Sequence, residues 1–203
     1  MKLIILEGGD RLGKSTIIEK LCKAVNYDNV CVRHFGKPPK GLTPEEFTKF
    51  QFNAFHRELN LFNLVNSRSQ EYSYYPEVMI WNRSHLGEYV YSQMFRGGKP
   101  EVLKNMLLDF ERGFISHDVY LITLTADPYF FLLREDGNSF SQNLEDKTKE
   151  LQLFKEAHDF SIIANKIVIK VDQEINDYEI KGIKLFRSKK DIFKEVKEFV
   201  KIK

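Results

Sequence analysis

The sequence predicts an α/β fold of the three-layer sandwich class, built on a mainly parallel five-stranded sheet. Short apolar runs rich in β-branched and aromatic residues do not alternate strictly with polar residues, which is typical of parallel strands buried on both faces. Longer segments with helical spacing lie between these runs, and such alternation favours parallel crossover units. With 203 residues, we expect one domain over residues 1–203.

The expected elements follow one another along the chain. The strands are expected at residues 2–6, 29–35, 77–81, 118–125 and 166–171. The helices are expected at residues 14–25, 43–65, 86–95, 100–114, 146–164 and 188–202. Asp127-Pro128 is a helix-start signal, and Ser188 with Asp191 is a capping signal for the last helix. That helix is amphipathic, so we expect it to pack against the sheet.

Composition excludes several classes of protein. The net charge is only +2, from 31 Lys and Arg against 29 Asp and Glu. The net charge of the molecule therefore gives no case for binding to nucleic acid or to a membrane. No apolar run approaches the roughly 20 residues that span a bilayer. The first apolar run ends at Glu7, too early for a secretory signal, so we expect a cytoplasmic protein. Neither the cysteines nor the histidines have metal-ligand spacing.

The most specific motif is LEGGDRLGKST at residues 6–16, which satisfies G-x-x-x-x-G-K-[ST]. In this pattern backbone N–H groups hold phosphates, the lysine reaches the outer phosphates and the hydroxyl binds Mg²⁺. The motif follows an expected strand and opens an expected helix, so a phosphate would meet the positive end of that helix. We expect an ATP site at Gly8, Gly9, Gly13, Lys14, Ser15 and Thr16, with Ser15 as the Mg²⁺ ligand.

A phosphate loop alone does not distinguish a switch, a motor and a kinase. Two residues inside the loop limit which of these classes the chain can belong to. Arg11 adds a permanent cation that would stabilise charge on a transferred phosphoryl group, as an arginine finger in cis does. A polyphosphate repels the Asp10 carboxylate, so we expect Asp10 to point toward a neutral donor such as a sugar hydroxyl.

This loop resembles that of the thymidylate kinases, whose pattern is an apolar residue followed by E-G-x-D-x-x-G-K-[ST]. In that family the loop aspartate binds the 3′-hydroxyl of the acceptor nucleotide, and the catalytic arginine lies either in this loop or in a lid. The chain resembles the first kind, because Arg11 is present and EDGNSFSQN at residues 135–143 contains no Arg or Lys. The resemblance implies a P-loop kinase fold with a lid at about residues 134–147, ATP and Mg²⁺, and a homodimer.

A second cluster follows the third expected strand. By resemblance, Arg83 grips the acceptor phosphate and Tyr91 approaches the sugar and base of the acceptor. The family carries an aspartate where this chain has Asn82, and a neutral amide offers no charge to a metal. Either Mg²⁺ is bound mainly by Ser15 and the phosphates, or the kinase activity is reduced.

The second expected strand runs into VRHFGKPPKG at residues 32–41, where Arg33 and Lys37 suit an anionic acceptor, although a solvated basic loop is the alternative. Thymidylate kinases place an arginine near Lys37. Deoxynucleoside kinases share the fold and carry a glutamate near this strand end, because a neutral 5′-hydroxyl needs a base. Residues 30–40 contain no Asp or Glu, which favours a monophosphate acceptor.

The helix that follows supplies candidates for the acceptor base. Phe52 and Arg57 are expected to stack on the base and touch its edge, although aromatic residues at this spacing are more often core. The Phe50-Gln51 pair also resembles the base-reading pair of deoxynucleoside kinases.

Arg134 lies just before the expected lid. On lid closure it would reach a donor phosphate. Pairing with Glu135 or Glu150 at the surface is the alternative.

The sequence therefore favours a kinase that moves the γ-phosphoryl of ATP to a deoxynucleoside monophosphate, with dTMP as the expected acceptor. Lys14, Arg11 and Arg83 are the expected catalytic residues. Acceptor contacts are expected from Asp10, Arg33, Lys37, Phe52, Arg57, Asn82, Arg83 and Tyr91. Two alternatives stay open: a deoxynucleoside kinase, and a nucleotide-binding module with weak turnover, which Asn82 suggests.

Overall fold

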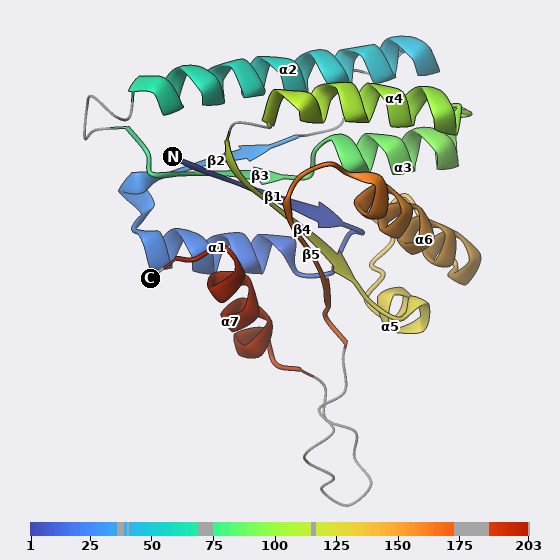
Figure 1. Ribbon diagram of the computed structural model, residues 1–203. Coiled ribbons are helices and arrows are strands. Elements are labelled where there is room, and N and C mark those ends of the chain that lie inside the picture. The colour runs from blue at the N-terminus through green and yellow to red at the C-terminus, as the bar shows by residue number, and fades with distance from the viewer. Residues whose placement is uncertain (36–38, 40, 69–74, 115–116, 173–186, 203) are drawn as a thin grey trace, which may run out of the picture.

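The computed structural model describes residues 1–35, 39, 41–68, 75–114, 117–172 and 187–202. Strands and helices largely alternate along the chain (Figure 1). The strands are β1 (Lys2–Gly8), β2 (Val30–His34), β3 (Val78–Asn82), β4 (Asp118–Thr125) and β5 (Asn165–Lys170). The helices are α1 (Lys14–Val25), α2 (Pro44–Arg68), α3 (His85–Arg96), α4 (Pro100–Glu111), α5 (Pro128–Leu132), α6 (Leu144–Phe160) and α7 (Lys189–Phe199), with 3₁₀ turns η1 (Tyr27–Asn29) and η2 (Arg112–Phe114).

All five strands run parallel, in the order β2-β3-β1-β4-β5. The central strand β1 pairs with β3 and β4, and Leu6 lies opposite Asn82 in this register. The carboxyl ends of parallel strands share one edge of a sheet, where open α/β folds bind ligands. The sheet therefore brings the phosphate loop after β1 next to Asn82 and Arg83 after β3.

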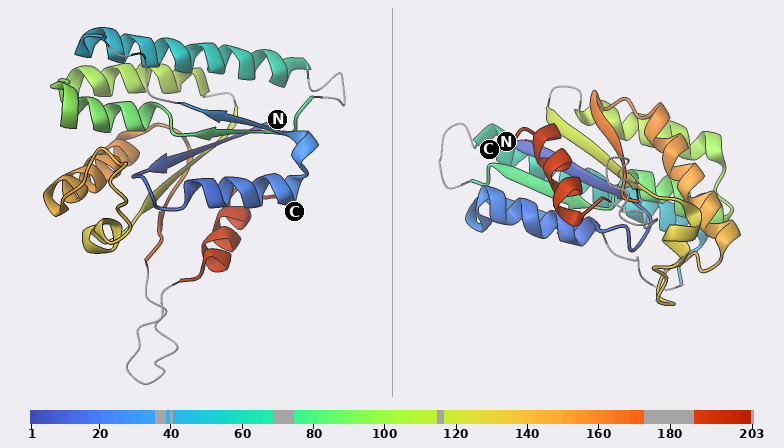
Figure 2. Two further views of the ribbon diagram at one scale, coloured as in Figure 1. Left: turned by 180° about the vertical axis from the view of Figure 1, so that it is seen from behind. Right: turned by 90° about the horizontal axis from the view of Figure 1, so that it is seen from below.

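Two helical layers cover the sheet, as both views show (Figures 1 and 2). Successive residues of a strand point to opposite faces. Leu3 and Ile5 of β1 accordingly pack with α2, α3, α4 and α6 on one face. Ile4 and Leu6 pack with α1 and α7 on the other face. All four side chains are fully buried, which explains why β1 reads as a continuous apolar run.

The predicted fold class is confirmed, and the sheet is wholly rather than mainly parallel. The Asp127 carboxylate caps α5 by accepting the Tyr129 N–H, and Ser188 with Asp191 forms a capping box at α7. Element ends shift by a few residues. The helix expected at 146–164 spans 144–160, because the Asn143 side chain caps its start by accepting the Asp146 N–H.

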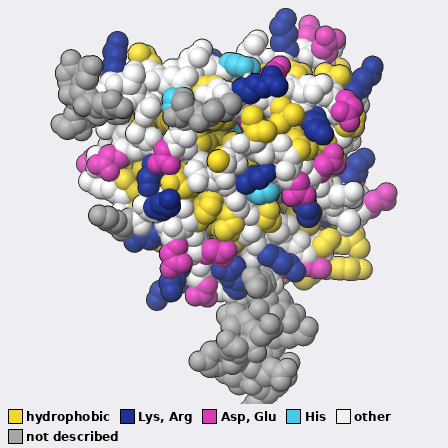
Figure 3. Space-filling view, viewed as in Figure 1, with side chains coloured by type: hydrophobic (Ala, Val, Ile, Leu, Met, Phe, Trp, Pro, Cys, Tyr) yellow, Lys and Arg dark blue, Asp and Glu magenta, His cyan; other side chains and the backbone are white. Residues whose placement is uncertain are grey.

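The described part of the chain contains no helix that is both long and apolar enough to cross a membrane. On the face drawn in Figure 3, Lys and Arg side chains are interspersed with Asp and Glu side chains. This face therefore carries no extended patch of a single charge.

Candidate active site

The phosphate loop turns sharply between β1 and α1. Gly8 and Gly13 have φ angles of 119° and 98°, a region that glycine enters without steric strain. A Cβ on Gly8 would also lie 2.4 Å from the carbonyl oxygen of Leu124 on β4. Glycine is therefore required at Gly8 by conformation and by packing, and the turn carries Lys14 and Ser15 to the start of α1.

Lys14 folds back over this loop. Its Nζ donates to the carbonyl oxygens of Gly8 at 2.6 Å and Gly9 at 2.7 Å, and it lies 4.0 Å from Asp10 Oδ1. Burial lowers the pKa of Lys14 to about 8, although the Asp10 carboxylate opposes this shift. A phosphate placed beside Nζ would favour the charged form. The loop thus holds a buried cation suited to an anionic ligand.

Arg11 and Arg134 connect the loop to residues 134–147, the segment predicted to form a lid and called the lid below. The Arg11 guanidinium forms an ion pair with Asp136, and the two side chains are 46% and 40% exposed. The Arg134 guanidinium lies 4.2 Å from the centre of the Phe130 ring, and its Nη1 lies 3.5 Å from the Arg11 carbonyl oxygen. Such an exposed ion pair adds little to stability, so a ligand can displace it at small cost.

The start of the lid is anchored by Glu135, which pairs with the fully buried Lys147. Glu135 also accepts the backbone N–H groups of Gly137 at 2.9 Å and Ser139 at 3.2 Å. Burial opposes ionisation, but these hydrogen bonds lower the pKa of Glu135 to about 2. The surface pair between Arg134 and Glu135, which was the alternative to a phosphate contact, is therefore not formed.

Glu150 does not pair with Arg134 either. It accepts hydrogen bonds from Tyr91 Oη at 2.8 Å and from Ser141 of the lid. Because Tyr91 belongs to α3, Glu150 ties the lid to that helix.

A polar pocket of about 470 Å³ lies at the phosphate loop. It is lined by Asp10, Arg11, Gly13, Lys14, Ser15, Thr16, Asn82, Arg83, Asn138 and Ser139. Loop, strand end and lid all contribute, so residues far apart in sequence converge on one polar cavity.

Arg83 connects the end of β3 to the phosphate loop in this cavity. Its backbone has φ 64°, a left-handed conformation that is uncommon outside glycine, and its N–H donates to the Leu6 carbonyl oxygen at 2.9 Å. Its guanidinium forms an ion pair with Asp10. Asp10 therefore faces two cations, Arg83 and Lys14, rather than turning away from the charged side of the loop.

Asn82 lies beside Arg83 and contacts the end of β2. Its Nδ2 lies 2.8 Å from His34 Nδ1. Its Oδ1 is buried and has no hydrogen-bond partner among the described residues. An oxygen of this kind can bind a ligand or a hydrated metal.

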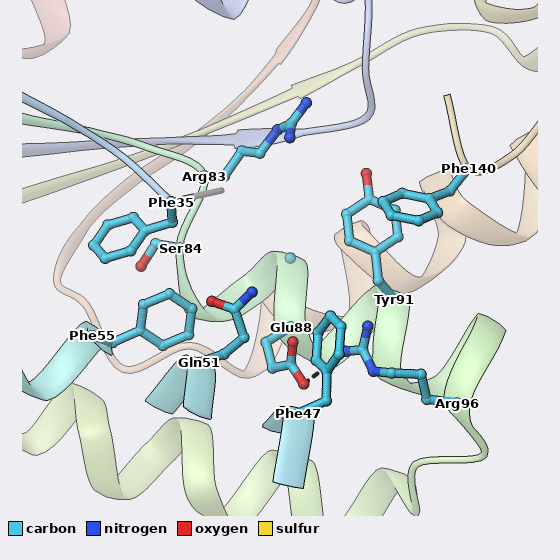
Figure 4. Close-up of a pocket in the computed structure, with 11 residues that line it drawn as sticks. Phe35, Phe47, Gln51, Phe55, Arg83, Ser84, Glu88, Tyr91, Arg96 and Phe140 are labelled. Atoms are coloured by element: carbon cyan, nitrogen blue, oxygen red, sulfur yellow. Dashed lines mark ion pairs between the residues drawn. The ribbon is translucent and has the colours of Figure 1, made fainter. Parts of the chain in front are cut away.

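A second pocket lies between α2 and α3 (Figure 4). Its walls are aromatic, from Phe35, Phe47, Phe55, Tyr91 and Phe140, and its polar groups come from Gln51, Arg83, Ser84, Glu88 and Arg96, with Gly87 completing the lining. Arg83 therefore lines both pockets. The pocket is small, about 60 Å³; the chemistry of its aromatic walls suits a planar ring, and Arg83 suits an anionic group.

Three of the described residues predicted as acceptor contacts line neither pocket, whereas Asp10 and Asn82 line the phosphate pocket. Phe52 is 5% exposed and packs into the core with Phe55 and Phe110, so its expected contact with a base is wrong. The Arg57 side chain is 78% exposed and lies near Glu58, away from both pockets, so its contact with a base stays a prediction.

Arg33 is held elsewhere too, since its Nε donates to Glu58 at 2.9 Å. Lys37 lies outside the described residues.

The predicted acceptor contacts omit several lining residues of α2, and Gln51 was considered only for its resemblance to the base-reading pair of deoxynucleoside kinases. Phe47, Gln51 and Phe55 are spaced by four and share one face of α2; Phe55 also packs in the core with Phe52, which does not line the pocket. Glu88 lies on α3 and is 5% exposed, although charged side chains are mostly exposed in proteins. Its burial could not be read from the sequence.

A buried carboxylate, Glu7, lies close to the phosphate loop. Glu7 is fully buried at the end of β1, and neither of its oxygens has a hydrogen-bond partner of good geometry among the described residues. Burial raises the pKa of Glu7 to about 7, opposed by His85, Lys14 and the nearby backbone N–H groups at the start of α3. Glu7 therefore lies between the phosphate loop and the helix that carries Tyr91.

No family model matches the chain, and no curated protein matches its sequence. Solved structures match its fold. The YorR protein from Bacillus subtilis, solved with phosphorylated GDP, gives a TM-score of 0.63 at 19% identity, over 98% of this chain and 95% of that chain.

Two thymidylate kinases show the same likeness. The enzyme from Candida albicans gives a TM-score of 0.61 at 15% identity, covering 98% of this chain and 90% of its own. The enzyme from Ehrlichia chaffeensis gives 0.57 at 16% identity, covering 97% of each chain. The chain therefore has, over almost its whole length, the P-loop kinase fold of the thymidylate kinases.

Proposed function

We propose that this protein is a kinase that transfers the γ-phosphoryl of ATP to a deoxynucleoside 5′-monophosphate, with dTMP as the acceptor favoured by sequence resemblance. The observation that carries the proposal is the position of Arg83, which lines both the phosphate pocket and the aromatic pocket. A phosphate beside Arg83 would lie next to the phosphate loop while its base occupied the aromatic pocket. The fold shared with two thymidylate kinases supports this class of reaction.

On the donor side, Lys14 and Arg11 would neutralise the transferred group, and the loop backbone would hold the phosphates. Arg134 lines a further cavity of about 240 Å³ together with Gly13 and Thr16. This cavity lies beside the start of α1, so it suits the remainder of ATP. Catalysis would rest on positioning and electrostatics, because a monophosphate is already a charged nucleophile.

The oxygen donors in the phosphate pocket fit Mg²⁺. Ser15 is exposed at the start of α1, and the buried Asn82 Oδ1 has no partner among the described residues. Mg²⁺ prefers oxygen ligands and keeps several waters, so neutral protein donors together with phosphate oxygens can suffice. When bound, the ion would offset phosphate charge; Ser15 would hold it, and Asn82 would orient its water shell.

The alternative acceptor, a nucleoside, requires a base at its 5′-hydroxyl. His34 is a candidate by position, at the end of β2. With Asn82 Nδ2 donating to Nδ1, however, a neutral His34 carries its proton on Nε2 and offers no free lone pair. This arrangement favours the monophosphate.

The test is a panel of the deoxynucleosides and their monophosphates with ATP and Mg²⁺, with products resolved by chromatography. We expect diphosphates from monophosphates and no product from nucleosides. A Lys14→Met variant, which lacks the loop cation, should be inactive and serves as the background control. Phosphorylation of thymidine alone would establish the nucleoside kinase instead. ATP binding by calorimetry without any product would establish a binding module.

A further inference from the structure

An ion pair joins the phosphate loop to the lid at the edge of the phosphate pocket. The Arg11 guanidinium contacts Asp136 through Nη2, and Arg11 lines the pocket whereas Asp136 is not among its lining residues. A guanidinium carries several N–H donors. Since Asp136 is bound at one corner of the group, the other N–H groups of Arg11 can meet a phosphoryl group while the ion pair is kept.

Asp136 is itself held by its neighbours in the lid. Its Oδ1 accepts the Asn138 backbone N–H at 3.2 Å, and its Oδ2 accepts from the Asn138 side chain at 3.1 Å. The preceding residue, Glu135, pairs with Lys147, whose side chain is fully buried on α6. A chain of polar contacts therefore runs from α6 through the start of the lid to Arg11.

The same segment also contacts the backbone of Arg11. Arg11 has a φ angle of 67°, a left-handed conformation that is uncommon outside glycine. Arg134 Nη1 lies 3.5 Å from the Arg11 carbonyl oxygen. The start of the lid thus contacts Arg11 at its main chain and at its guanidinium.

Stability does not account for the ion pair, because exposed pairs of this kind contribute little to it. Order in the Arg11 side chain is a better account. An arginine that stabilises a transferred phosphoryl group must give up rotamer freedom in the transition state, and a partner that orders it beforehand lowers that cost. Residues 135–143 contain no Arg or Lys, so the lid acts on the charge in the pocket through a cation of the loop.

We propose that Asp136 is a positioning residue that holds the Arg11 guanidinium at the phosphate pocket for phosphoryl transfer. This inference rests on the proposed function, which assigns Arg11 to the transferred group. Asp136 acts through Arg11 and needs no contact with either substrate.

The test measures kcat and both KM values with ATP, Mg²⁺ and the best monophosphate acceptor. Asp136→Asn keeps the size of the side chain but loses its charge, so kcat should fall by about 10-fold with little change in either KM. Asp136→Ser, a second neutral variant, should give the same loss, and Asp136→Glu should recover most of kcat. Asp159→Asn, the same change in the exposed ion pair with Lys155, should keep the wild-type kcat.

A double-mutant cycle with Arg11→Ala separates positioning from a direct role. In the Arg11→Ala background, Asp136→Asn should leave kcat unchanged, because the side chain that Asp136 orders is absent. An equal loss in both backgrounds would overturn the inference, as would an unchanged kcat in Asp136→Asn alone. A rise in kcat would overturn it too, since Asp136 would then compete with the phosphate for Arg11.

Failure of the proposed function gives a different result, because the wild-type protein would then convert no monophosphate. Turnover by the wild type together with any of the three contrary results overturns the positioning role alone. Thermal unfolding of each variant checks the fold, which the loss of an exposed ion pair should preserve.

Discussion

The two halves of the site are built in different ways. The phosphate side comes largely from one continuous segment, residues 8–16, which needs only a strand end, two left-handed glycines and a helix start. The acceptor side is assembled from the end of β2, one face of α2, the start and end of α3, and Phe140 of the lid. A local motif thus defines the half proposed to bind the phosphate donor, the donor half, whereas tertiary packing defines the half proposed to bind the acceptor, the acceptor half.

The chemistry of the two halves differs as well. The donor half is polar, and its outermost pair, Arg11 with Asp136, is partly exposed. The acceptor half is aromatic and places its charged pair, Glu88 with Arg96, out of water. Changes in the donor half should therefore act on the rate of transfer, whereas changes in the acceptor half should act on binding, specificity and stability.

The largest expected effect comes from Arg11→Ala in the donor half. Loss of a transition-state cation should lower kcat by about 10³-fold with little change in acceptor KM. Thermal stability should barely change, because the ion pair is partly exposed. Lys155→Ala, which breaks another exposed ion pair, is the control and should keep kcat. A tenfold rise in KM with normal kcat would make Arg11 a binding residue and blur the contrast between the halves.

Two phenylalanines of α2 sharpen the comparison within the acceptor half. Phe52→Ala should cost about 3 kcal/mol or more of unfolding free energy, because it empties a core site. Phe47→Ala should cost much less stability but raise the acceptor KM. Urea unfolding and steady-state kinetics on both variants provide the measurement. A KM effect confined to Phe52→Ala would reverse the two assignments.

Glu7 connects the halves, and its titration predicts a pH effect on stability. Its folded pKa of about 7 exceeds its ordinary value of 4.5, so the folded state favours the protonated form. This contribution is complete below about pH 4.5 and is lost as the pH rises through about 7.

Glu7→Gln should remove that loss and raise the unfolding free energy at pH 8 by on the order of 2 kcal/mol relative to wild type. Urea unfolding at pH 5 and pH 8 measures the difference. An identical pH dependence in wild type and variant would exclude Glu7 as its source.

The smallest expected effect is at Asn82, where the halves meet. Asn82→Asp should raise turnover a few-fold at limiting Mg²⁺, because a carboxylate attracts the hydrated ion more strongly than an amide. Turnover is titrated against Mg²⁺ in both proteins. An unchanged metal dependence would show that residue 82 has no role toward the metal.

The sequence signals of the donor half are local, and the loop residues that they name line one pocket in the structure. The glycines of the phosphate loop, the strand before it and the helix after it act over a few residues. The acceptor half was predicted less well, because a helix presents different residues to the core and to a pocket, and only its neighbours decide which. Phe52 and Arg57 were assigned to the pocket, but Phe52 faces the core and Arg57 faces solvent.

The sequence by itself determined the parallel α/β fold, the phosphate loop and the caps of α5 and α7, since periodicity and short motifs encode these features. Only the tertiary structure decided that Arg83 serves two pockets, that Lys147 anchors the lid through Glu135, and that Glu88 and Arg96 are buried together. The physical reason is that burial and pairing of charges depend on side chains brought together by the fold, and a single sequence does not record that proximity.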